Sequence, residues 1–288
     1  MAMEIMPLRD VERLSSSVIR ILGGNPGKFT LQGTNTYIVG TGPKRLLIDT
    51  GEGKPSWIAL LKETLKRENA SIAEAIITHW HGDHIGGVKQ LQDFSPQTII
   101  YKNQPSDGLQ NIADGQKFHV EGASLRAFFS PGHTQDHMSL VLEEEDAMFT
   151  GDNVLGHGTA VFEDLLTYLN SLEKMRGVFG GRAYPGHGPV VEDGLNKILE
   201  YIRHRQQRED QVIQVLKSSQ SEDSETASDL GEWTSMEIVK IVYKDVPESL
   251  HLPANGGVIQ ILRKLKEENK VLENPRTERW RLRNRAAL

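Results

Sequence analysis

Three histidines and one aspartate fall within six consecutive residues of this chain, as His79, His81, Asp83 and His84. The apolar run at residues 75–77 indicates a strand just before them, so these side chains are expected to diverge where a buried strand ends. Imidazole is a common metal ligand in proteins, and a carboxylate adds a harder, negatively charged one. The cluster therefore favours a metal site where a buried strand ends. The alternative is a solvated loop with no chemical role.

Three more candidate ligands follow later apolar runs. His133 and His187 each come after a Pro-Gly pair, and Asp152 comes after Thr-Gly. The chain has no cysteine, which leaves His, Asp and Glu as its strong metal ligands. These seven candidates exceed the three or four ligands of one tetrahedral zinc. They suit two metals about 3.5–4 Å apart that share a carboxylate and leave a position open for water.

Short β-rich runs alternate with turns and a few helices from residue 18 to about residue 184, which predicts an α+β domain. Strands are expected at residues 18–22, 36–39, 45–49, 75–78, 98–101, 117–120, 123–129, 138–143 and 147–150, and helices at 56–68, 86–94, 165–179 and 194–218. Several of the strands end in a polar or ligand-like residue beside glycine, which lets the backbone turn tightly.

The chain is expected to divide into a catalytic domain at residues 1–218, an acidic linker at 219–231 and a winged-helix-like domain at 232–288. The linker is polar and acidic without periodicity. The last segment shows two helical patterns, at 235–243 and 256–268, and then a short strand pair with basic residues between the strands. The alternative for this segment is a small helical cap that packs against the main domain.

Charge is unevenly distributed along the chain. The formal net charge is −6, yet residues 263–288 carry nine Lys or Arg against four Asp or Glu. A basic segment of this kind favours contact with phosphates, and Trp280 is a candidate stacking surface for a base; the alternative is a solvated C-terminus. No stretch approaches the roughly 18 apolar residues of a membrane helix, so no membrane partner is expected. Residues 1–24 are a poor mitochondrial presequence, because acidic residues offset their arginines.

The order and approximate spacing of the ligand segments resemble the metallo-β-lactamase superfamily over about residues 15–190. The resemblance implies an αββα sandwich, in which two mixed sheets face each other with helices outside and the metal site lies along one sheet edge. It implies ligand roles by position: for metal one His79, His81 and His133, for metal two Asp83, His84 and His187, with Asp152 bridging. Asp49 matches the first motif of the superfamily, where the resemblance implies a supporting role behind the ligands.

Segments outside the metal motifs are similar to the β-lactamase-like protein 2 endoribonucleases, and this similarity spans nearly the full length. It includes residues 31–37, 161–165, 168–172 and the C-terminal domain. The resemblance implies an endoribonuclease that cleaves single-stranded RNA with two zinc ions, manganese being an alternative. A hydroxide bridging the two metals would attack the phosphodiester, and Asp83 would act catalytically by orienting or relaying a proton. The implied location is the mitochondrial matrix, with the cytoplasm as the alternative.

The metal site by itself does not choose the electrophile, so two other functions remain open. One is a glyoxalase-II-like thioester hydrolase, whose leading motif is nearly the same. The other is a non-catalytic metal-binding scaffold, against which the complete ligand set argues. Four further residues are candidate substrate contacts, each with a packing or surface role as its alternative: His137, His157, Asn170 and Ser171. The oligomeric state is left open.

Overall fold

The computed structural model describes residues 7–218 and 231–283. The predicted acidic linker, 219–231, lies outside the described residues except for its last position. Among the helices that are described, none is both long enough and apolar enough to span a bilayer. Contacts between residues divide the chain into two compact units, Met1–Leu199 and Glu200–Leu288, whereas the sequence placed the first boundary after residue 218.

The first unit contains a sheet of seven strands in sequential order. They are β1 (Val11–Arg13), β2 (Val18–Leu22), β3 (Asn35–Val39), β4 (Lys44–Ile48), β5 (Ser71–Ile77), β6 (Ile99–Lys102) and β7 (Gln110–Asn111). The pairs from β1 to β4 are antiparallel, and those from β4 to β7 are parallel. Every residue of β2 and β3 is buried, as expected for strands covered on both faces.

A second sheet of five strands faces the first. Its order is β12 (Ala183–Pro185), β11 (Ala147–Gly151), β10 (Met138–Leu142), β9 (Ala123–Phe129) and β8 (Lys117–Val120). All its pairs are antiparallel except β11 with β12, which run parallel. The 3₁₀ helix η1 (Glu143–Glu145) connects β10 to β11.

One apolar cluster fills the space between the two sheets. Tyr37 and Leu46 of the first sheet share it with Leu125, Leu140 and Phe149 of the second, and all five are almost fully buried. The Tyr37 and Phe149 rings meet edge to face, with their centroids 5.0 Å apart. Apolar burial of this kind is the main favourable term in folding, and here it holds the two sheets face to face.

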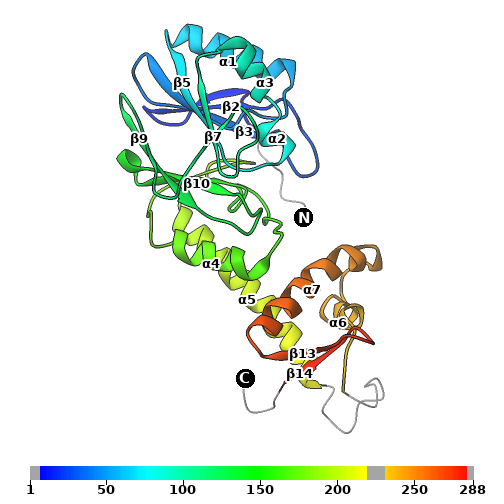
Figure 1. The fold of residues 1–288 in the computed structure, drawn as a ribbon. Helices are drawn as coiled ribbons and strands as arrows, with labels where there is room; N and C mark the ends of the chain where they lie inside the picture. The colour runs from blue at the N-terminus through cyan, green and yellow to red at the C-terminus, as the bar shows by residue number, and fades with distance from the viewer. Residues whose placement is uncertain (1–6, 219–230, 284–288) are drawn as a thin grey trace. The chain divides into compact units, whose positions relative to one another are not determined.

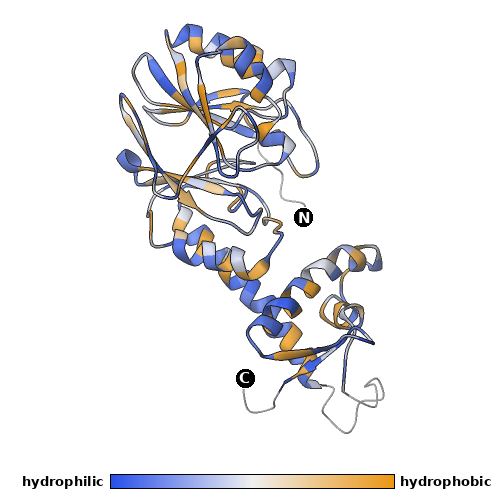
Figure 2. Cartoon of the chain, viewed as in Figure 1, coloured by the Kyte–Doolittle hydropathy of each residue, from blue (hydrophilic) through white to orange (hydrophobic). Residues whose placement is uncertain are grey.

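Helices cover the outer faces of the sheets. Helices α1 (Pro55–Arg67) and α3 (Val88–Phe94) lie on the first sheet, where Trp57, Leu61 and Leu91 share a buried cluster with strand residues. Helix α4 (Leu165–Met175) lies beyond the second sheet, and the long α5 (Gly194–Ser218) follows it in the chain. Figure 1 shows these layers, which confirm the expected αββα sandwich. Figure 2 shows hydrophilic and hydrophobic residues side by side along α1, as expected for a helix with one buried face.

The second unit has the order of a winged helix, which confirms that expectation. It contains α6 (Ser235–Val242), the 3₁₀ helix η2 (Glu248–Leu250), α7 (His251–Glu267) and the hairpin of β13 (Val271–Asn274) with β14 (Arg279–Leu282). Thr234 and Glu237 form a reciprocal capping box that satisfies the first turn of α6. Lys264 of α7 donates to Glu209 of α5 at 2.7 Å, and both side chains are buried.

Short elements account for most differences from the sequence prediction. Strands β1, β7 and β12 were not expected, and neither was α2 (Gly82–Ile85); they have two to four residues each, too few to show a period. Helix α4 ends at Met175, before the predicted residue 179. Helix α7 begins at His251 and not at 256, because it continues through the glycines at 256 and 257.

The packing of α1 gives a direct test of the outer layer. Replacing the fully buried Leu61 by alanine should lower the free energy of unfolding by about 2–5 kcal/mol, because a cavity opens between the helix and the sheet. Glu63→Ala, at an exposed position of the same helix, should change it by about 0.5 kcal/mol or less. Urea unfolding of the two variants measures both values, and equal values would contradict the described packing.

Candidate metal centre

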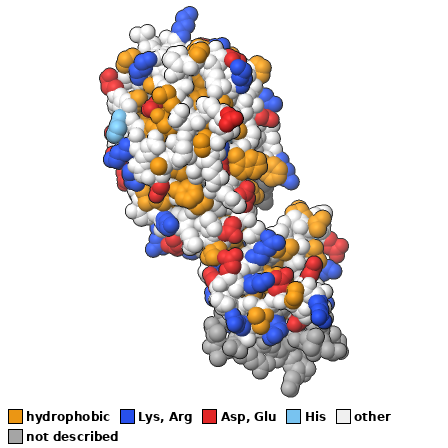
Figure 3. All heavy atoms as spheres, in the orientation of Figure 1, with side chains coloured by type: hydrophobic (Ala, Val, Ile, Leu, Met, Phe, Trp, Pro, Cys, Tyr) orange, Lys and Arg blue, Asp and Glu red, His pale blue; other side chains and the backbone are white. Residues whose placement is uncertain are grey.

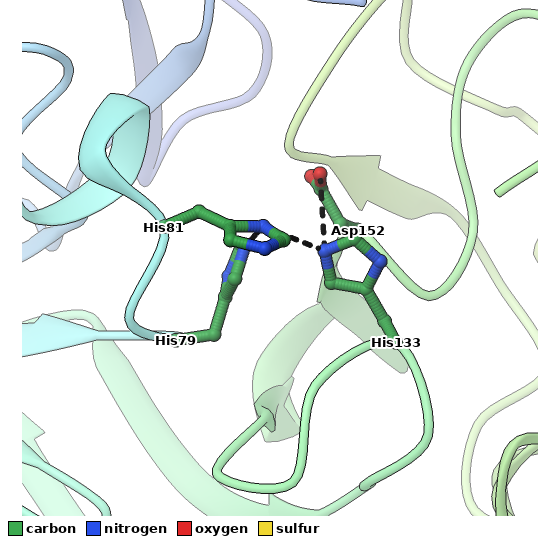
Figure 4. Close-up of side chains that lie close together, drawn as sticks. All are labelled: His79, His81, His133 and Asp152. Carbon is green, nitrogen blue, oxygen red and sulfur yellow. Dashed lines mark hydrogen bonds and ion pairs between the residues drawn. The ribbon is translucent and has the colours of Figure 1, made fainter. Parts of the chain in front are cut away.

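Four predicted ligands form one tight group. His79, His81, His133 and Asp152 each offer a ligand atom, and these atoms all lie within 4.8 Å of one another. The Nδ1 atom of His81 is 3.0 Å from Nε2 of His79 and 3.0 Å from Nε2 of His133. Figure 4 shows the three imidazoles and the Asp152 carboxylate turned toward a common centre.

The other three predicted ligands, Asp83, His84 and His187, form a second group, and their ligand atoms also lie within 4.8 Å of one another. Asp152 lies between the groups. Its Oδ1 is 3.3 Å from His84 Nε2, and its Oδ2 is 3.3 Å from His187 Nε2 and 3.6 Å from His133 Nε2. The structure therefore brings all seven predicted ligands together, with one carboxylate in contact with both groups.

Both sheets deliver these side chains from strand ends. His79 follows β5 of the first sheet, whereas His133, Asp152 and His187 follow β9, β11 and β12 of the second. Asp83 and His84 lie on the short helix α2. A backbone hydrogen bond from Met138 N to Thr78 O, 2.8 Å long, joins the sheets beside the site. Ligands held at strand ends keep their geometry because the sheets are rigid.

Asp49, for which the resemblance implied a supporting role, contacts His84 from the side away from the metal position. Its Oδ1 accepts from Thr78 N at 2.8 Å, and its Oδ2 accepts from Thr78 Oγ1 at 2.9 Å and lies 2.7 Å from His84 Nδ1. A carboxylate on Nδ1 orients the ring and leaves Nε2 to face the metal position. His133 is oriented in the same way, because its Nδ1 lies 2.8 Å from the Val161 carbonyl oxygen.

The two Pro-Gly-His turns require their glycines. A Cβ on Gly132 would approach Tyr168 Cα to 2.3 Å, and Gly132 has φ +129°. A Cβ on Gly186 would approach Asp152 Oδ1 to 2.3 Å and His84 Cε1 to 2.9 Å. Backbone and ligands approach so closely at both turns that no side chain fits between them.

Residues 34–37 hold the second of these turns, a role that their sequence did not predict. The Asn35 amide donates to the carbonyls of Pro185 and Gly188, both at 2.9 Å, and Tyr37 donates to Pro185 O at 2.6 Å. The buried Thr34 donates from Oγ1 to Asp83 Oδ2 at 3.0 Å, which fixes that carboxylate. The Gly-Thr-Asn-Thr run beside a strand was the only sequence signal for this role. The residues that it contacts, Pro185, Gly188 and Asp83, lie far away in the chain.

The four candidate substrate contacts have different outcomes. His157 lines a pocket that also includes His81, His133 and His187. His137 is fully buried, and its Nε2 accepts from the Asp152 backbone N–H at 3.2 Å, so it positions a ligand and cannot touch substrate. Ser171 donates to Pro131 O at 2.6 Å, which gives it a structural role beside the His133 turn. Asn170 is exposed and is not among the residues that line the pockets.

Burial and charge shift the pKa of His79 downward and those of His84 and His187 upward. Burial and the neighbouring imidazoles hold the pKa of His79 well below its usual value. Burial also disfavours the charged form of His84 and His187, but the Asp152 carboxylate outweighs it, raising the pKa of His84 well above its usual value and that of His187 to about 9. Burial opposes ionisation of Asp83 too, yet contact with His187 and His84 lowers its pKa to about 2.

The donor set fits two divalent cations. Five imidazoles and two carboxylates converge, and neutral imidazole with carboxylate is a common ligand set for zinc-like metals. His79, His81, His133 and Asp152 would hold one ion, and Asp83, His84 and His187 would hold the other, with Asp152 within reach of both. The residues present do not by themselves select zinc over manganese.

A pocket of about 1050 Å³ opens onto both groups. Its floor includes His81, Asp83, His133, Asp152 and His187. Its walls come from two loops, residues 25–31 and residues 155–161, which contribute mainly apolar side chains: Pro26, Phe29, Leu31, Leu155, Ala160 and Val161. Phe29 and Val161 are largely exposed, at 73% and 62%, so the mouth of the pocket is apolar as well.

The fold and this site are those of an αββα hydrolase whose His and Asp cluster fits divalent metals. The Metallo-beta-lactamase superfamily model matches residues 29–187, and the Beta-lactamase associated winged helix domain model matches residues 234–280. The chain belongs to the metallo-beta-lactamase superfamily.

Several proteins resemble the chain over most of its length. It is 47% identical to the lactamase-like protein adaB of Aspergillus niger, over 95% of this chain and 88% of that protein. It is 46% identical to an atrochrysone carboxyl ACP thioesterase of Cryptosporiopsis sp. (95% of this chain, 88% of that protein) and 48% identical to one of Aspergillus chevalieri (92% and 86%). A solved beta-lactamase domain protein from Burkholderia ambifaria has the same fold, with a TM-score of 0.75 and 14% identity over 94% of this chain and 93% of that one.

The close approach at Gly186 predicts a loss of metal affinity. Gly186→Ala should displace Asp152 or His84 and weaken metal binding about 10–100-fold, the range found when groups supporting metal ligands are altered. Gly82→Ala is the matched control, because a Cβ there meets nothing within 4 Å. Competition against a chromogenic chelator measures the affinities, and equal affinity in the two variants would contradict the described geometry.

The protonation pattern predicts separate titrations in protein freed of metal by a chelator. His187 should hold its proton until about pH 9, whereas His79 should be neutral at pH 6.5. Since the folded pKa of His187 exceeds its unfolded value of about 6.5, its ion pairs stabilise the metal-free fold fully below pH 6.5 and lose that effect as the pH rises through 9. NMR of the imidazole carbons follows each ring, with His187→Ala for assignment. A common midpoint near 6.5 would contradict the pattern.

Proposed function

We propose that this chain is a thioester hydrolase that releases an apolar acyl group from an acyl carrier protein. The observation that carries the proposal is the apolar pocket directly above the histidine and carboxylate groups. Relatives 46–48% identical over more than nine-tenths of the chain bear the name atrochrysone carboxyl ACP thioesterase, which supports the same reaction class here. Thioester hydrolysis was the second choice from sequence, after RNA cleavage.

The pocket lining suits an apolar acyl group better than a nucleic acid strand. Lys28 is the one Lys or Arg among the described residues that line it, whereas Glu52, Asp83 and Asp152 add negative charge. Grooves that follow a single strand of RNA carry several cations and exposed aromatic rings. Apolar walls with a few polar groups at one end are usual for small-molecule sites.

The C-terminal unit gives little support to RNA binding. Five of its described cations pair with acidic side chains: Lys264 with Glu209, Lys266 with Glu273, Lys270 with Glu268, Arg279 with Glu237 and Arg281 with Glu232. Figure 3 shows Lys and Arg mixed with Asp and Glu on the visible face of this unit. Trp280 is only 5% exposed and its backbone pairs with Trp233, so it offers no stacking surface for a base, contrary to the sequence prediction.

The reaction breaks a carbon–sulfur bond and forms a carbon–oxygen bond. Water adds its oxygen to the thioester carbonyl carbon, a carboxylic acid forms, and one proton passes to the departing thiolate. Two divalent cations, when bound, would supply Lewis acidity toward the carbonyl and would lower the pKa of a bound water to about 7. Asp83, ionised at neutral pH and held by Thr34, is placed to accept the proton of the attacking water. The apolar walls bind the acyl group and exclude bulk water.

A panel of substrates tests this function. Purified protein loaded with zinc or manganese receives an aromatic acyl group as a carrier-protein thioester, the same acyl group as a pantetheine thioester, S-lactoylglutathione, and end-labelled single-stranded RNA. We expect hydrolysis of the first two, seen as free thiol, and a loss of kcat by about 10²-fold or more in Asp83→Asn, in line with the contribution of a general base.

The matched control is Asn170→Asp, at an exposed position away from the described pockets, which should keep wild-type rates. Metal content is measured in every variant, so that loss of a ligand is separated from loss of a proton acceptor. Cleavage of RNA without release of thiol from any thioester would overturn the proposal in favour of the endoribonuclease.

A further inference from the structure

A second pocket, of about 500 Å³, lies beside the two groups of candidate metal ligands, and none of those ligands lines it. It is lined by Trp80, Lys102, Gln104, Gln135, Asp136 and Glu163. On the basis of the proposed function, we propose that this pocket holds the pantetheine arm of the thioester while the acyl group occupies the larger pocket.

The second pocket is joined to the reacting centre through two histidines. Trp80 stands between His79 and His81 in the chain, and its ring centroid is 4.5 Å from that of His81. On the other side, Glu163 N donates to His133 O at 3.2 Å, and Glu163 Oε2 accepts from Gln135 N at 3.1 Å. His81 and His133 also line the larger pocket. A thioester carbonyl at these histidines can therefore place its two substituents in different pockets.

The wall of the second pocket is fixed before any ligand arrives. Lys102 and Asp136 form a buried ion pair, and the Lys102 ammonium also donates to Asn103 O at 2.8 Å and Gln104 O at 3.3 Å. Asp136 in turn accepts from Thr134 Oγ1 at 2.7 Å. These bonds connect the segment after β6 to the turn that carries His133. A preformed wall lowers the entropy lost on binding.

The charges of this pocket select a neutral occupant. Lys102 is the one cation among the described residues that line this pocket, and its three donors are all used by Asn103, Gln104 and Asp136. Glu163 adds a negative charge, so the pocket does not attract a phosphate or a phosphodiester. Gln104 and Gln135 present side-chain amides, which both donate and accept hydrogen bonds. A chain of amides and methylenes, as in pantetheine, matches this lining.

Trp80 supplies the apolar part of the site. It is 52% exposed, whereas Trp57, Trp233 and Trp280 are at most 5% exposed. A large exposed indole ring beside a polar pocket offers a surface for the methylenes and branched methyls of the arm. Since the other three tryptophans are buried, a change of fluorescence on ligand binding reports mainly on Trp80.

Binding is tested first without chemistry. The probe is an N-alkyl pantothenamide, which has the amides of pantetheine but no thiol to ligate a metal. We expect saturable quenching of tryptophan fluorescence in the wild-type protein, with and without metal. By calorimetry, affinity should fall about tenfold in Trp80→Ala and in Gln104→Ala and stay near wild type in Trp80→Phe, which keeps an aromatic surface. Equal affinity in all four proteins would overturn the assignment of the pocket.

Kinetics then connect the pocket to the thioester. The same acyl group is offered as a pantetheine thioester and as a short methyl thioester. Trp80→Ala should raise KM for the long substrate about tenfold more than for the short one, whereas Trp80→Phe should not separate them. If the wild-type protein hydrolyses neither thioester, the proposed function fails. If it hydrolyses both and the variant affects them equally, only the second pocket has been wrongly assigned.

Discussion

The carboxylate of Asp49 is the contact on which the metal site depends. It follows β4 and accepts from the backbone and hydroxyl of Thr78 while its Oδ2 lies 2.7 Å from His84 Nδ1, so it joins the end of β4 to the end of β5 and to α2. Asp49 adopts φ +58°, a left-handed conformation that aspartate tolerates better than most residues. Without this carboxylate, no side chain would connect the segment that carries His79 to the His84 ring, and their relative positions would be less well fixed. Asp49 therefore orients His84, Thr34 holds Asp83, and the tight turns at Gly132 and Gly186 place ligands that follow the second sheet.

The two groups of candidate ligands differ in how their histidines respond to burial and to neighbouring charge. In the first group, burial lowers the pKa of His79 and of His81 and so favours the neutral imidazole, which is the form that binds a metal. In the group of His187, the Asp152 carboxylate favours protonated rings, so protons balance the buried carboxylates when no cation does. Metal and protons therefore compete for the second group more strongly than for the first. Such an arrangement keeps the metal-free chain folded and leaves its site preformed for the ions.

The sequence pattern predicted most strands and the residues that the structure brings together at the site, but it did not predict the contacts that hold those residues. Strands β2, β8 and β9 have the predicted bounds because each is a separate β-rich run between turn signals. The ligands were visible because histidine beside glycine at a strand end has few structural uses. Thr34, by contrast, meets Asp83 across 49 positions, and nothing local in the sequence records such a contact. His137 was considered for the substrate pocket, yet it is buried behind Asp152, because spacing from His133 does not tell on which side of a turn a ring lies.

The substrate is decided by loops that the ligand pattern does not include. The same seven donors serve any electrophile that accepts a hydroxide, so the choice rests on which molecule fits around them. On one side, residues 25–31 and 155–161 give apolar walls with a single Lys or Arg among the described lining residues. On the other side, the Lys102 ammonium donates all its hydrogen bonds to protein oxygens. The side-chain amides of Gln104 and Gln135 and the exposed Trp80 ring are then the groups available to a ligand. Neither lining offers the several Lys or Arg side chains that a polyanion needs, among the residues described. A molecule with an apolar acyl end and a neutral amide arm would find a complementary surface on each, and the bond between those two parts is the thioester.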